Sequence, residues 1–374
     1  SFIPYDIKRK FELPSYREKD SIFAYHFYRL LQRSKRIDLI YNSKVDQLKG
    51  GERSRFVDQL IYEMPKKNPN VKINQIHMAP PLESSIQEEV EITKSEEHIK
   101  SIQAHLNKGL SPSALNSFLQ CPLNYYYKYI LGMKEEEIIE EKIENHTFGT
   151  VIHDSLEALY QPYVKQILDQ KSIQAIKTQV DDEVKKQYKK SLNLVPDSGS
   201  HRLAYEVAKR LVKDTIEVDQ KVVEKGDQIQ IIALEQQVKW ETEIKINDKI
   251  SQHVLLKGKI DRIDRKNNKV RIIDYKSGKV DSTDISYRDL DSLTSGRKSI
   301  ALQMLLYQLI YQNKFSEEAE AGVISMRNIQ SDFIKLRPKD ENDAMDVLKI
   351  VISELLNPNA PFRHNEKSIY CPFC

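Results

Sequence analysis

Two aspartates and a lysine lie in one short stretch of the chain where they could carry out metal-dependent chemistry. The segment 258–279 reads GKIDRIDRKNNKVRIIDYKSGK and contains Asp261, Asp274 and Lys276. Carboxylate oxygens are the ligands that Mg²⁺ and Mn²⁺ prefer. A divalent ion can polarise a phosphodiester and activate water, while a nearby amine stabilises the negative charge that develops. The residue types therefore predict a hydrolytic centre with Asp261, Asp274 and Lys276 as its catalytic groups.

These three side chains must meet, and the flanking pattern indicates how. Residues 253–264 and 269–275 alternate between apolar and polar side chains, which predicts two strands joined by the polar loop 265–268. If that loop has four residues, Asp261 shares a face with Asp274 and Lys276 and lies diagonally from Asp274, at roughly 7–8 Å. A one-residue slip would separate the two aspartates. The alternative is a solvated hairpin with exposed charges.

The remaining pattern predicts the frame that holds this hairpin. Further strands are predicted at 227–240 and 320–327, and helices at 111–130, 149–167, 171–192, 201–225, 298–314 and 341–356. This order favours an α/β fold with one central mixed sheet flanked by helices. Nearer the N-terminus we expect helices at 20–35 and 53–64, a short strand at 36–41, and a proline-rich, acidic linker at 65–108.

Composition limits the class of protein. Hydrophobic residues make up 40% and charged residues 30%, which is enough apolar material for a folded core. The net charge is only +3, so any surface that binds nucleic acid must be local. The three cysteines and the lack of an apolar leader argue against a disulfide-framed secreted protein. With no apolar run long enough for a membrane helix, we expect a cytoplasmic protein with no membrane partner. Both ends resemble cut points, so we expect a fragment of a longer protein.

The aspartate segment resembles the core motif of the PD-(D/E)XK nucleases, specifically the RecB-like and AddB-like group. Companion motifs occur in the expected order. FGTVIHDSLE, with Gly149 and His153, is similar to the Gly-x-x-x-His motif, and ALQMLLYQLIY, with Gln303 and Tyr307, is similar to the Gln-x-x-x-Tyr motif. The segment 110–130 resembles the opening of nuclease domains in AddB-type proteins. The resemblance implies a restriction-endonuclease-like core at 109–374 that uses Mg or Mn.

The resemblance also implies roles for individual residues. His153, Asp261 and Asp274 would bind the metal together with the carbonyl of Tyr275, and Lys276 would be the catalytic lysine. Gln303 and Tyr307, four residues apart and so on one helical face, would bind DNA. In isolation, His153 is more often a core or surface histidine and Tyr307 a core tyrosine. Several basic residues between the motifs either contact phosphates or belong to a solvated charged loop: Lys257, Lys259, Arg262, Lys279, Arg288, Arg297 and Lys298.

The cysteines match part of a second metal site. In the AddB-like and Cas4-like branches of the family, four cysteines hold a [4Fe-4S] cluster. Cys121, Cys371 and Cys374 match three of these positions, so the resemblance implies an iron-sulfur cluster in a longer parent protein and an incomplete set here. The alternatives are a buried thiol at Cys121 and a zinc site.

The N-terminal segment 1–64 resembles the end of a superfamily 1 helicase domain, because Tyr28 and Arg33 fit its Tyr-x-x-x-x-Arg motif. No phosphate-binding Gly-x-x-x-x-Gly-Lys motif occurs in the sequence, so we expect no ATPase activity. Whether Arg33 is vestigial, as the loss of helicase function in AddB-like proteins would imply, is left open by the sequence. Together these resemblances imply an exonuclease domain of an AddB-like helicase–nuclease subunit. It would process DNA ends in double-strand break repair and recombination, with an AddA-like helicase partner. The alternatives are a catalytically silent DNA-binding module of the same fold and a Cas4-like nuclease.

Overall fold

The computed structural model describes residues 16–41, 53–76, 90–133, 143–196, 199–247, 250–328, 332–340 and 343–365, and the statements below concern these residues. The chain divides into two compact units, Ser1–Ile86 and Gln87–Cys374, which are described separately. Among the described helices, none combines the length and the apolar character needed to cross a bilayer.

A five-stranded sheet forms the centre of the larger unit. Its strands are β1 (Ile229–Asn247), β2 (Ile250–Lys266), β3 (Lys269–Lys276), β4 (Ala319–Ser325) and β5 (Ile334–Lys335), in that spatial order. The pairs β1–β2, β2–β3 and β4–β5 are antiparallel, whereas β3 and β4 are parallel. The mixed sheet confirms the predicted α/β class. It places the strand that ends at Lys276 in the middle of the sheet.

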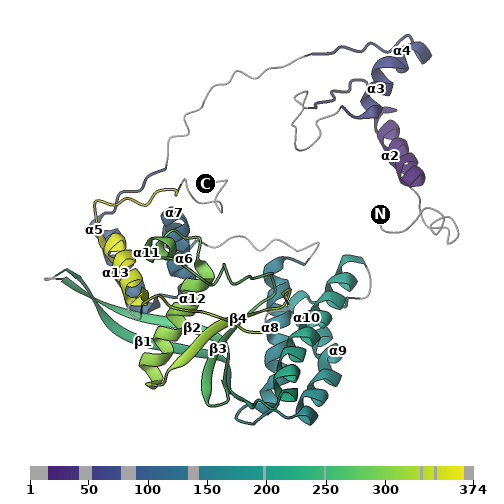
Figure 1. Ribbon diagram of the computed structural model, residues 1–374. Helices are drawn as coiled ribbons and strands as arrows, with labels where there is room; N and C mark the ends of the chain where they lie inside the picture. Colours follow the sequence, from purple (N-terminus) through teal and green to yellow (C-terminus); the bar gives the residue numbers. More distant parts are fainter. Residues whose placement is uncertain are drawn as a thin grey trace. The chain divides into compact units, whose positions relative to one another are not determined.

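Helices cover both faces of the sheet (Figure 1). One layer is built from α5 (Glu96–Gly109), α6 (Pro112–Gln120), α7 (Pro122–Tyr125), α12 (Ser299–Phe315) and α13 (Asp343–Leu356), together with the short α11 (Leu290–Thr294). The other layer consists of α8 (Asn145–Tyr160), α9 (Gln170–Leu192) and α10 (Gly199–Glu224). Each layer buries its own apolar cluster against the sheet, and β1, β3 and β4 contribute residues to both clusters.

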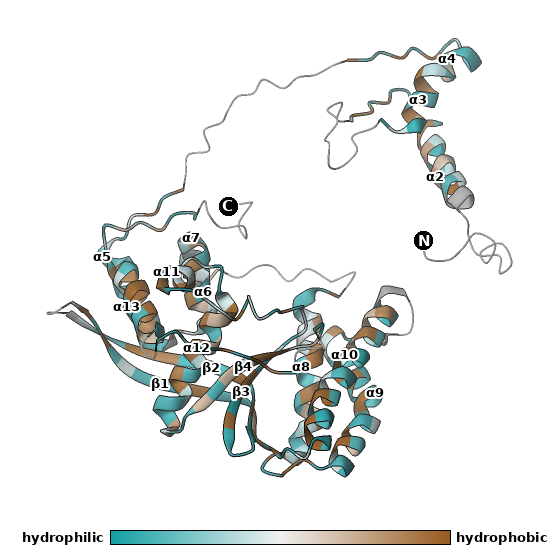
Figure 2. Ribbon diagram, in the orientation of Figure 1, coloured by the Kyte–Doolittle hydropathy of each residue, from teal (hydrophilic) through white to brown (hydrophobic). Residues whose placement is uncertain are grey.

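The central strands are apolar because helices cover them on both sides. Six consecutive residues of β3 are buried, and β4 is almost as enclosed. Figure 2 shows apolar residues concentrated along the sheet and on the inner sides of the helices, with polar residues outside. Charged residues inside this frame, such as Asp274, are therefore exceptions that need a specific explanation.

The turn between β2 and β3 is shorter than predicted. Lys266 pairs with Lys269, so the loop contains two residues, Asn267 and Asn268, and not four. Both have positive φ, 46° and 68°, a conformation that asparagine tolerates and that hairpins with two-residue turns require. The register therefore differs by two residues from the predicted one. Because side chains repeat every two residues, Asp261 and Asp274 still share a face.

The helix predicted over 111–130 is broken. The structure has α6, then α7, then the π-helical turn η1 (Tyr126–Ile130). Pro122 has no N–H to continue the hydrogen-bond ladder, so α6 ends at Cys121 and a new helix begins there.

The first and last described segments of the larger unit lie side by side. Ile92 and Phe362 form a β-bridge with two backbone hydrogen bonds of 2.9 Å. From there α5 begins at its N-cap Ser95, inside the segment that we predicted as a linker, and packs against β2. The sequence analysis did not expect this helix, although Ile99, Ile102 and Leu106 have helical spacing.

The smaller unit contains α2 (Tyr16–Leu31), α3 (Arg55–Tyr62) and α4 (Met64–Lys67). Phe27 of α2 stacks on Phe56 of α3, and the Tyr28 hydroxyl donates to Gln59 at 2.6 Å. The strand predicted at 36–41 is wrong, since these residues have no regular secondary structure and pair with no other described segment. A strand forms only where another strand takes up its backbone hydrogen bonds.

Candidate metal-dependent active site

The candidate site lies where β2 and β3 stop pairing. The antiparallel register ends at Arg262 and Ile273, one residue before Asp261 and Asp274. Beyond that point the Asp261 side chain replaces the backbone ladder, because Oδ2 accepts the N–H of Tyr275 at 2.7 Å. The carboxylate of Asp261 is thereby fixed beside the end of β3.

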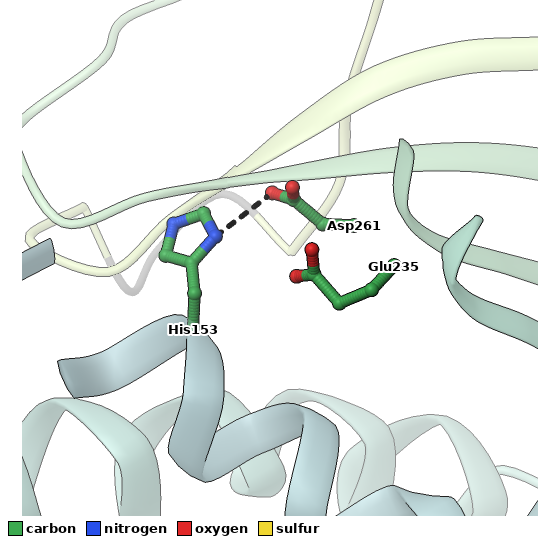
Figure 3. A group of neighbouring side chains, drawn as sticks. All are labelled: His153, Glu235 and Asp261. Carbon is green, nitrogen blue, oxygen red and sulfur yellow. Dashed lines mark ion pairs between the residues drawn. The ribbon is translucent and has the colours of Figure 1, made fainter. Parts of the chain in front are cut away.

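His153 and Glu235 complete a group of possible metal ligands around Asp261. His153 comes from α8, and its Nδ1 lies 3.3 Å from Asp261 Oδ2. One ligand atom from each of His153, Glu235 and Asp261 lies within 4.8 Å of the other two. Figure 3 shows the imidazole and the two carboxylates pointing toward one another from a helix and two strands. The predicted pair of His153 and Asp261 is thus brought together.

Glu235 is the residue that sequence reasoning missed. It has φ of 46° within β1, a left-handed conformation that is rare and costly for a residue with a side chain. The pairing of β1 with β2 is also irregular just before it, between Ile231 and Ala233. Such local distortions re-aim a side chain, but the alternating pattern of 227–240 gives no sign of one. We find no sequence signal that identifies Glu235.

Asp274 and Lys276 form a second cluster with Gln303 of α12. Lys276 Nζ lies 2.8 Å from Asp274 Oδ2 and donates to Gln303 Oε1 at 3.1 Å. Gln303 Nε2 in turn donates to Asp274 Oδ1 at 2.8 Å. The amide of Gln303 therefore fixes both partners at once and holds the lysine beside the carboxylate.

Tyr307, one turn after Gln303, anchors α12 to β2. Its hydroxyl donates to the backbone carbonyl of Lys259 at 2.7 Å and accepts from Gln303 Nε2 at 3.2 Å. The ring lies against Gly258, where a Cβ atom would come within 2.5 Å of Tyr307 Cε1. Tyr307 is 6% exposed. The structure thus shows Tyr307 as a buried support for Gln303, and a direct contact of Tyr307 with DNA stays a prediction.

The electrostatics of the site are those of crowded carboxylates. Burial and the charge of Asp261 raise the pKa of Asp274 to about 6, although Lys276 opposes this. Burial also raises the pKa of Glu235, while its ion pair with Lys259 lowers it, and the net shift is upward. Burial lowers the pKa of His153, but the hydrogen bond and charge of Asp261 outweigh burial and raise it overall. Nearby negative charge thus contributes to all three upward shifts, and burial adds to it at the two carboxyl groups.

The donor set fits a divalent cation. An imidazole nitrogen and carboxylate oxygens from His153, Glu235 and Asp261 converge, and the nearby Asp274 adds a further carboxylate. Oxygen-rich sites of this kind suit Mg²⁺ or Mn²⁺. A cation there would cancel the repulsion that raises the carboxyl pKa values. The part of the carbonyl of Tyr275 in such a site stays a prediction.

On the opposite face of the same strands, the charged side chains pair with one another. Arg262 is fully buried, and it donates to both carboxylate oxygens of Asp219 on α10 and to the hydroxyl of Tyr275. Its Nη2 also lies 2.5 Å from Asp264, which accepts two further bonds from Arg271 at 2.8 Å. The prediction that Arg262 contacts phosphates is wrong, because alternation along β2 turns it away from the Asp261 face.

Cys121 is buried at the junction of α6 and α7, where its Sγ accepts the N–H of Asn124 at 3.4 Å. His364 Nδ1 lies 3.9 Å from this Sγ. Cys371 and Cys374 lie outside the described residues, so the iron-sulfur hypothesis stays a prediction.

Comparison with known proteins agrees with this geometry. Residues 109–374 match the model of the PD-(D/E)XK nuclease superfamily. A subunit of the ATP-dependent helicase/deoxyribonuclease from Clostridium tetani is 27% identical over 236 residues, which is 58% of this chain and 19% of that protein. The corresponding subunit from Alkaliphilus oremlandii is 26% identical over 264 residues, 65% of this chain and 21% of that protein. The matched region therefore spans about a fifth of these relatives.

A crystal structure of a candidate exonuclease from Eubacterium rectale also resembles the chain. The TM-score is 0.39 at 14% identity, covering 75% of this chain and 90% of that one. A likeness at this level carries no weight in the functional argument.

Proposed function

Because the chain belongs to the PD-(D/E)XK nuclease superfamily, we propose that residues 109–374 form a metal-dependent deoxyribonuclease domain. The observation that carries the proposal is the meeting of two clusters at one end of β2 and β3. One is the ligand group His153, Glu235 and Asp261, and the other is Asp274 held to Lys276. A single centre with both clusters has what hydrolysis of a phosphodiester requires.

His153, Glu235, Asp261 and Asp274 would hold the ion, Mg²⁺ or Mn²⁺, which supplies Lewis acidity toward the phosphate and makes water a better nucleophile at neutral pH. Lys276 is the group of this chain that acts on the reacting atoms. Its ammonium, fixed by Asp274 and Gln303, donates hydrogen bonds to a water or to the phosphate oxygens as negative charge develops.

We further propose that this domain is part of a larger AddB-like protein. The relatives are named as subunits of ATP-dependent helicase/deoxyribonucleases. Those names support a deoxyribonuclease that works together with a helicase. Our proposal goes further, to a cytoplasmic exonuclease that acts on DNA ends in break repair and recombination beside an AddA-like helicase subunit. The same proposal includes a helicase-like tail at 1–64 and a nuclease domain at 109–374. Of the segment 65–108 between them, α5 packs against β2 and therefore belongs with the nuclease fold.

Replacing Lys276 by alanine tests the assignment of the centre. With labelled single-stranded DNA and Mn²⁺, we expect the variant to cleave at least about a hundredfold more slowly than wild type, as for loss of one group that stabilises transition-state charge. Lys186→Ala is the matched control. Lys186 lies on α9, is 69% exposed and pairs with Glu183, so its loss should leave the rate unchanged. Equal rates for wild type and Lys276→Ala would refute the proposal.

A further inference from the structure

A cleft leads away from the candidate centre. It has a volume of about 750 Å³ and begins at Lys276, Gln303 and Tyr307. From there it extends along β1 and β2 and reaches α6 and the π-helical turn η1, where Lys128 lines it. Part of this cleft belongs to the centre already described, but its far part does not.

The lining of the cleft is basic. Five lysines line it, and among the residues that the structure describes no aspartate or glutamate does. The chain as a whole has 58 basic and 55 acidic residues, so a random lining would contain both kinds. A surface with cations and no acids attracts an anion.

Two of these lysines oppose each other. Lys239 of β1 and Lys257 of β2 are direct partners in the antiparallel register, so their side chains emerge side by side on one face. Like charges directly opposite destabilise a sheet. Neither lysine has an ion pair with any described residue, whereas Lys259 is paired with Glu235 and Lys276 with Asp274. The pair Lys239 and Lys257 is therefore a local cost that an anion in the cleft would remove.

Lys128 is a third lysine of the cleft that has no ion pair with a described residue. Its Nζ lies 5.9 Å from the ring centroid of Tyr129, a cation–π contact and not an ion pair. Both residues are in η1, and π-helical turns of this kind occur frequently at functional sites. Tyr129 also lines the cleft, and the opening of α6 supplies hydroxyl groups from Ser111 and Ser113. Cations, hydroxyls and an aromatic ring along one groove are the features that bind a nucleic-acid strand.

We propose that Lys128, Lys239 and Lys257 form a strand-holding subsite, which binds the phosphates of a single nucleic-acid strand away from the position of cleavage. The inference rests on the proposed function, because it takes the cleft's other end as the cutting centre. The subsite acts on affinity for the strand and not on the chemistry at Lys276. Binding there requires no metal ion.

Strand binding without metal is the direct test. In EDTA, with a fluorescein-labelled single-stranded oligothymidylate, the anisotropy titration reports affinity while cleavage is blocked. We expect the triple variant Lys128→Gln, Lys239→Gln, Lys257→Gln to bind at least about tenfold more weakly near 0.1 M salt. The slope of log K against log salt should fall by about 0.7 per lysine removed.

The matched control removes three charges elsewhere. Lys171, Lys185 and Lys189 are exposed on α9, away from the cleft, and have no ion pair with described residues. Their triple glutamine variant has the same net charge as the subsite variant. We expect it to keep wild-type affinity and salt slope. Equal losses in both triple variants, or no loss in either, would overturn the subsite.

Stability separates binding from folding. Because Lys239 and Lys257 repel each other, Lys239→Gln and Lys257→Gln should each leave the melting temperature unchanged or raise it, while each weakens strand binding. If the triple variant unfolds, these single variants carry the test, and wild-type affinity in both would overturn the proposal. Weak binding by the subsite variants together with unimpaired cleavage by Lys276→Ala would reject the centre and keep the subsite. Wild-type binding with cleavage lost in Lys276→Ala would do the reverse.

Discussion

The two faces of the β2–β3 pair carry the same kinds of side chain in opposite electrostatic states. On the rear face, Arg262 and Arg271 balance Asp219 and Asp264, and all four are buried and paired. On the front face, the carboxylates of Glu235, Asp261 and Asp274 have two lysines as partners. Burial, together with the negative charge of Asp261, raises the pKa values of Glu235 and Asp274. Asp261 and Arg262 are neighbours in one strand, yet Asp261 belongs to the candidate metal site and Arg262 to the buried ion pairs of the opposite face.

The rear-face charges therefore stabilise the fold, whereas the front-face charges are arranged to bind a ligand. On the rear face, hydrogen bonds among the four charged side chains offset the cost of desolvating them. Removing one of these side chains leaves a buried charge without its partner. On the front face, the carboxylates repel one another until a cation binds. Removing one of these acids therefore costs little stability but much activity. Four experiments test whether the two faces differ in this way.

The largest effect should come from the rear face. Arg262→Leu leaves Asp219 and Asp264 buried with fewer partners, so we expect the free energy of unfolding to fall by about 3–5 kcal/mol. Arg265→Gln is the matched control, since Arg265 lies in the same strand but is 37% exposed and paired with Glu317. Its loss should cost no more than about 1 kcal/mol. Urea denaturation of both variants measures this, and similar losses would erase the distinction between the faces.

On the front face, Asp261→Asn should affect activity and not folding. The amide oxygen can still accept the Tyr275 N–H, so we expect a stability change within about 1 kcal/mol. Loss of a metal-binding carboxylate should weaken Mn²⁺ binding in calorimetry and slow cleavage by about a hundredfold or more. Asp291→Asn, an exposed acid of α11, serves as the control. A large loss of stability in Asp261→Asn would mean that the front face is structural as well.

A smaller effect should follow from crowding the support of Gln303. The Cβ of Gly258→Ala would come within 2.5 Å of the buried Tyr307 ring, so the ring must move and its bond to Lys259 must weaken. Overpacking of this kind costs about 1–3 kcal/mol, and we expect slower cleavage because Gln303 loses its anchor. Gly278→Ala is the control, because no atom lies within 4 Å of the Cβ it would add. Thermal unfolding and cleavage rates compare the two, and equal behaviour would contradict this role for Tyr307.

The smallest effect is a pH dependence of the metal-free protein. The folded-state pKa of Asp274, about 6, exceeds the value of about 3.9 for an unfolded aspartate. The folded protein therefore binds this proton more tightly, and the contribution of Asp274 to stability falls as pH rises from about 4 through 6. The raised pKa of His153 acts in the same direction.

In EDTA we accordingly expect a lower melting temperature at pH 7.5 than at pH 5, a difference that Mn²⁺ reduces by replacing the proton as counter-charge. Calorimetry with and without Mn²⁺ measures it, and Asp274→Asn should show a smaller difference. An Asp274→Asn variant with the full wild-type dependence would assign the effect to other groups.

The sequence was sufficient for the fold class and for the meeting of Asp261 with Asp274, because both depend on periodicity. Side chains on a strand alternate between the two faces with a period of two residues. The predicted loop at Asn267 and Asn268 was two residues too long, so Asp261 and Asp274 were still placed on the same face. Helical spacing likewise located α9 and α12 to within about two residues.

What the sequence could not give depends on backbone distortion and on tertiary partners. Glu235 reaches the centre through a positive φ that no local pattern announces. Arg262 looks like a DNA-binding residue until Asp219, 43 positions away, is seen to bind it. The strand expected at 36–41 had the right composition but no partner.

The β-bridge between Ile92 and Phe362 holds the first and last described segments of the nuclease fold side by side. A domain with adjoining ends can be inserted into a host protein, or hung from one, without stretching either. A single covalent connection at this place would carry the whole domain, with the candidate metal site inside it. The same nuclease domain could therefore be joined to proteins of very different size.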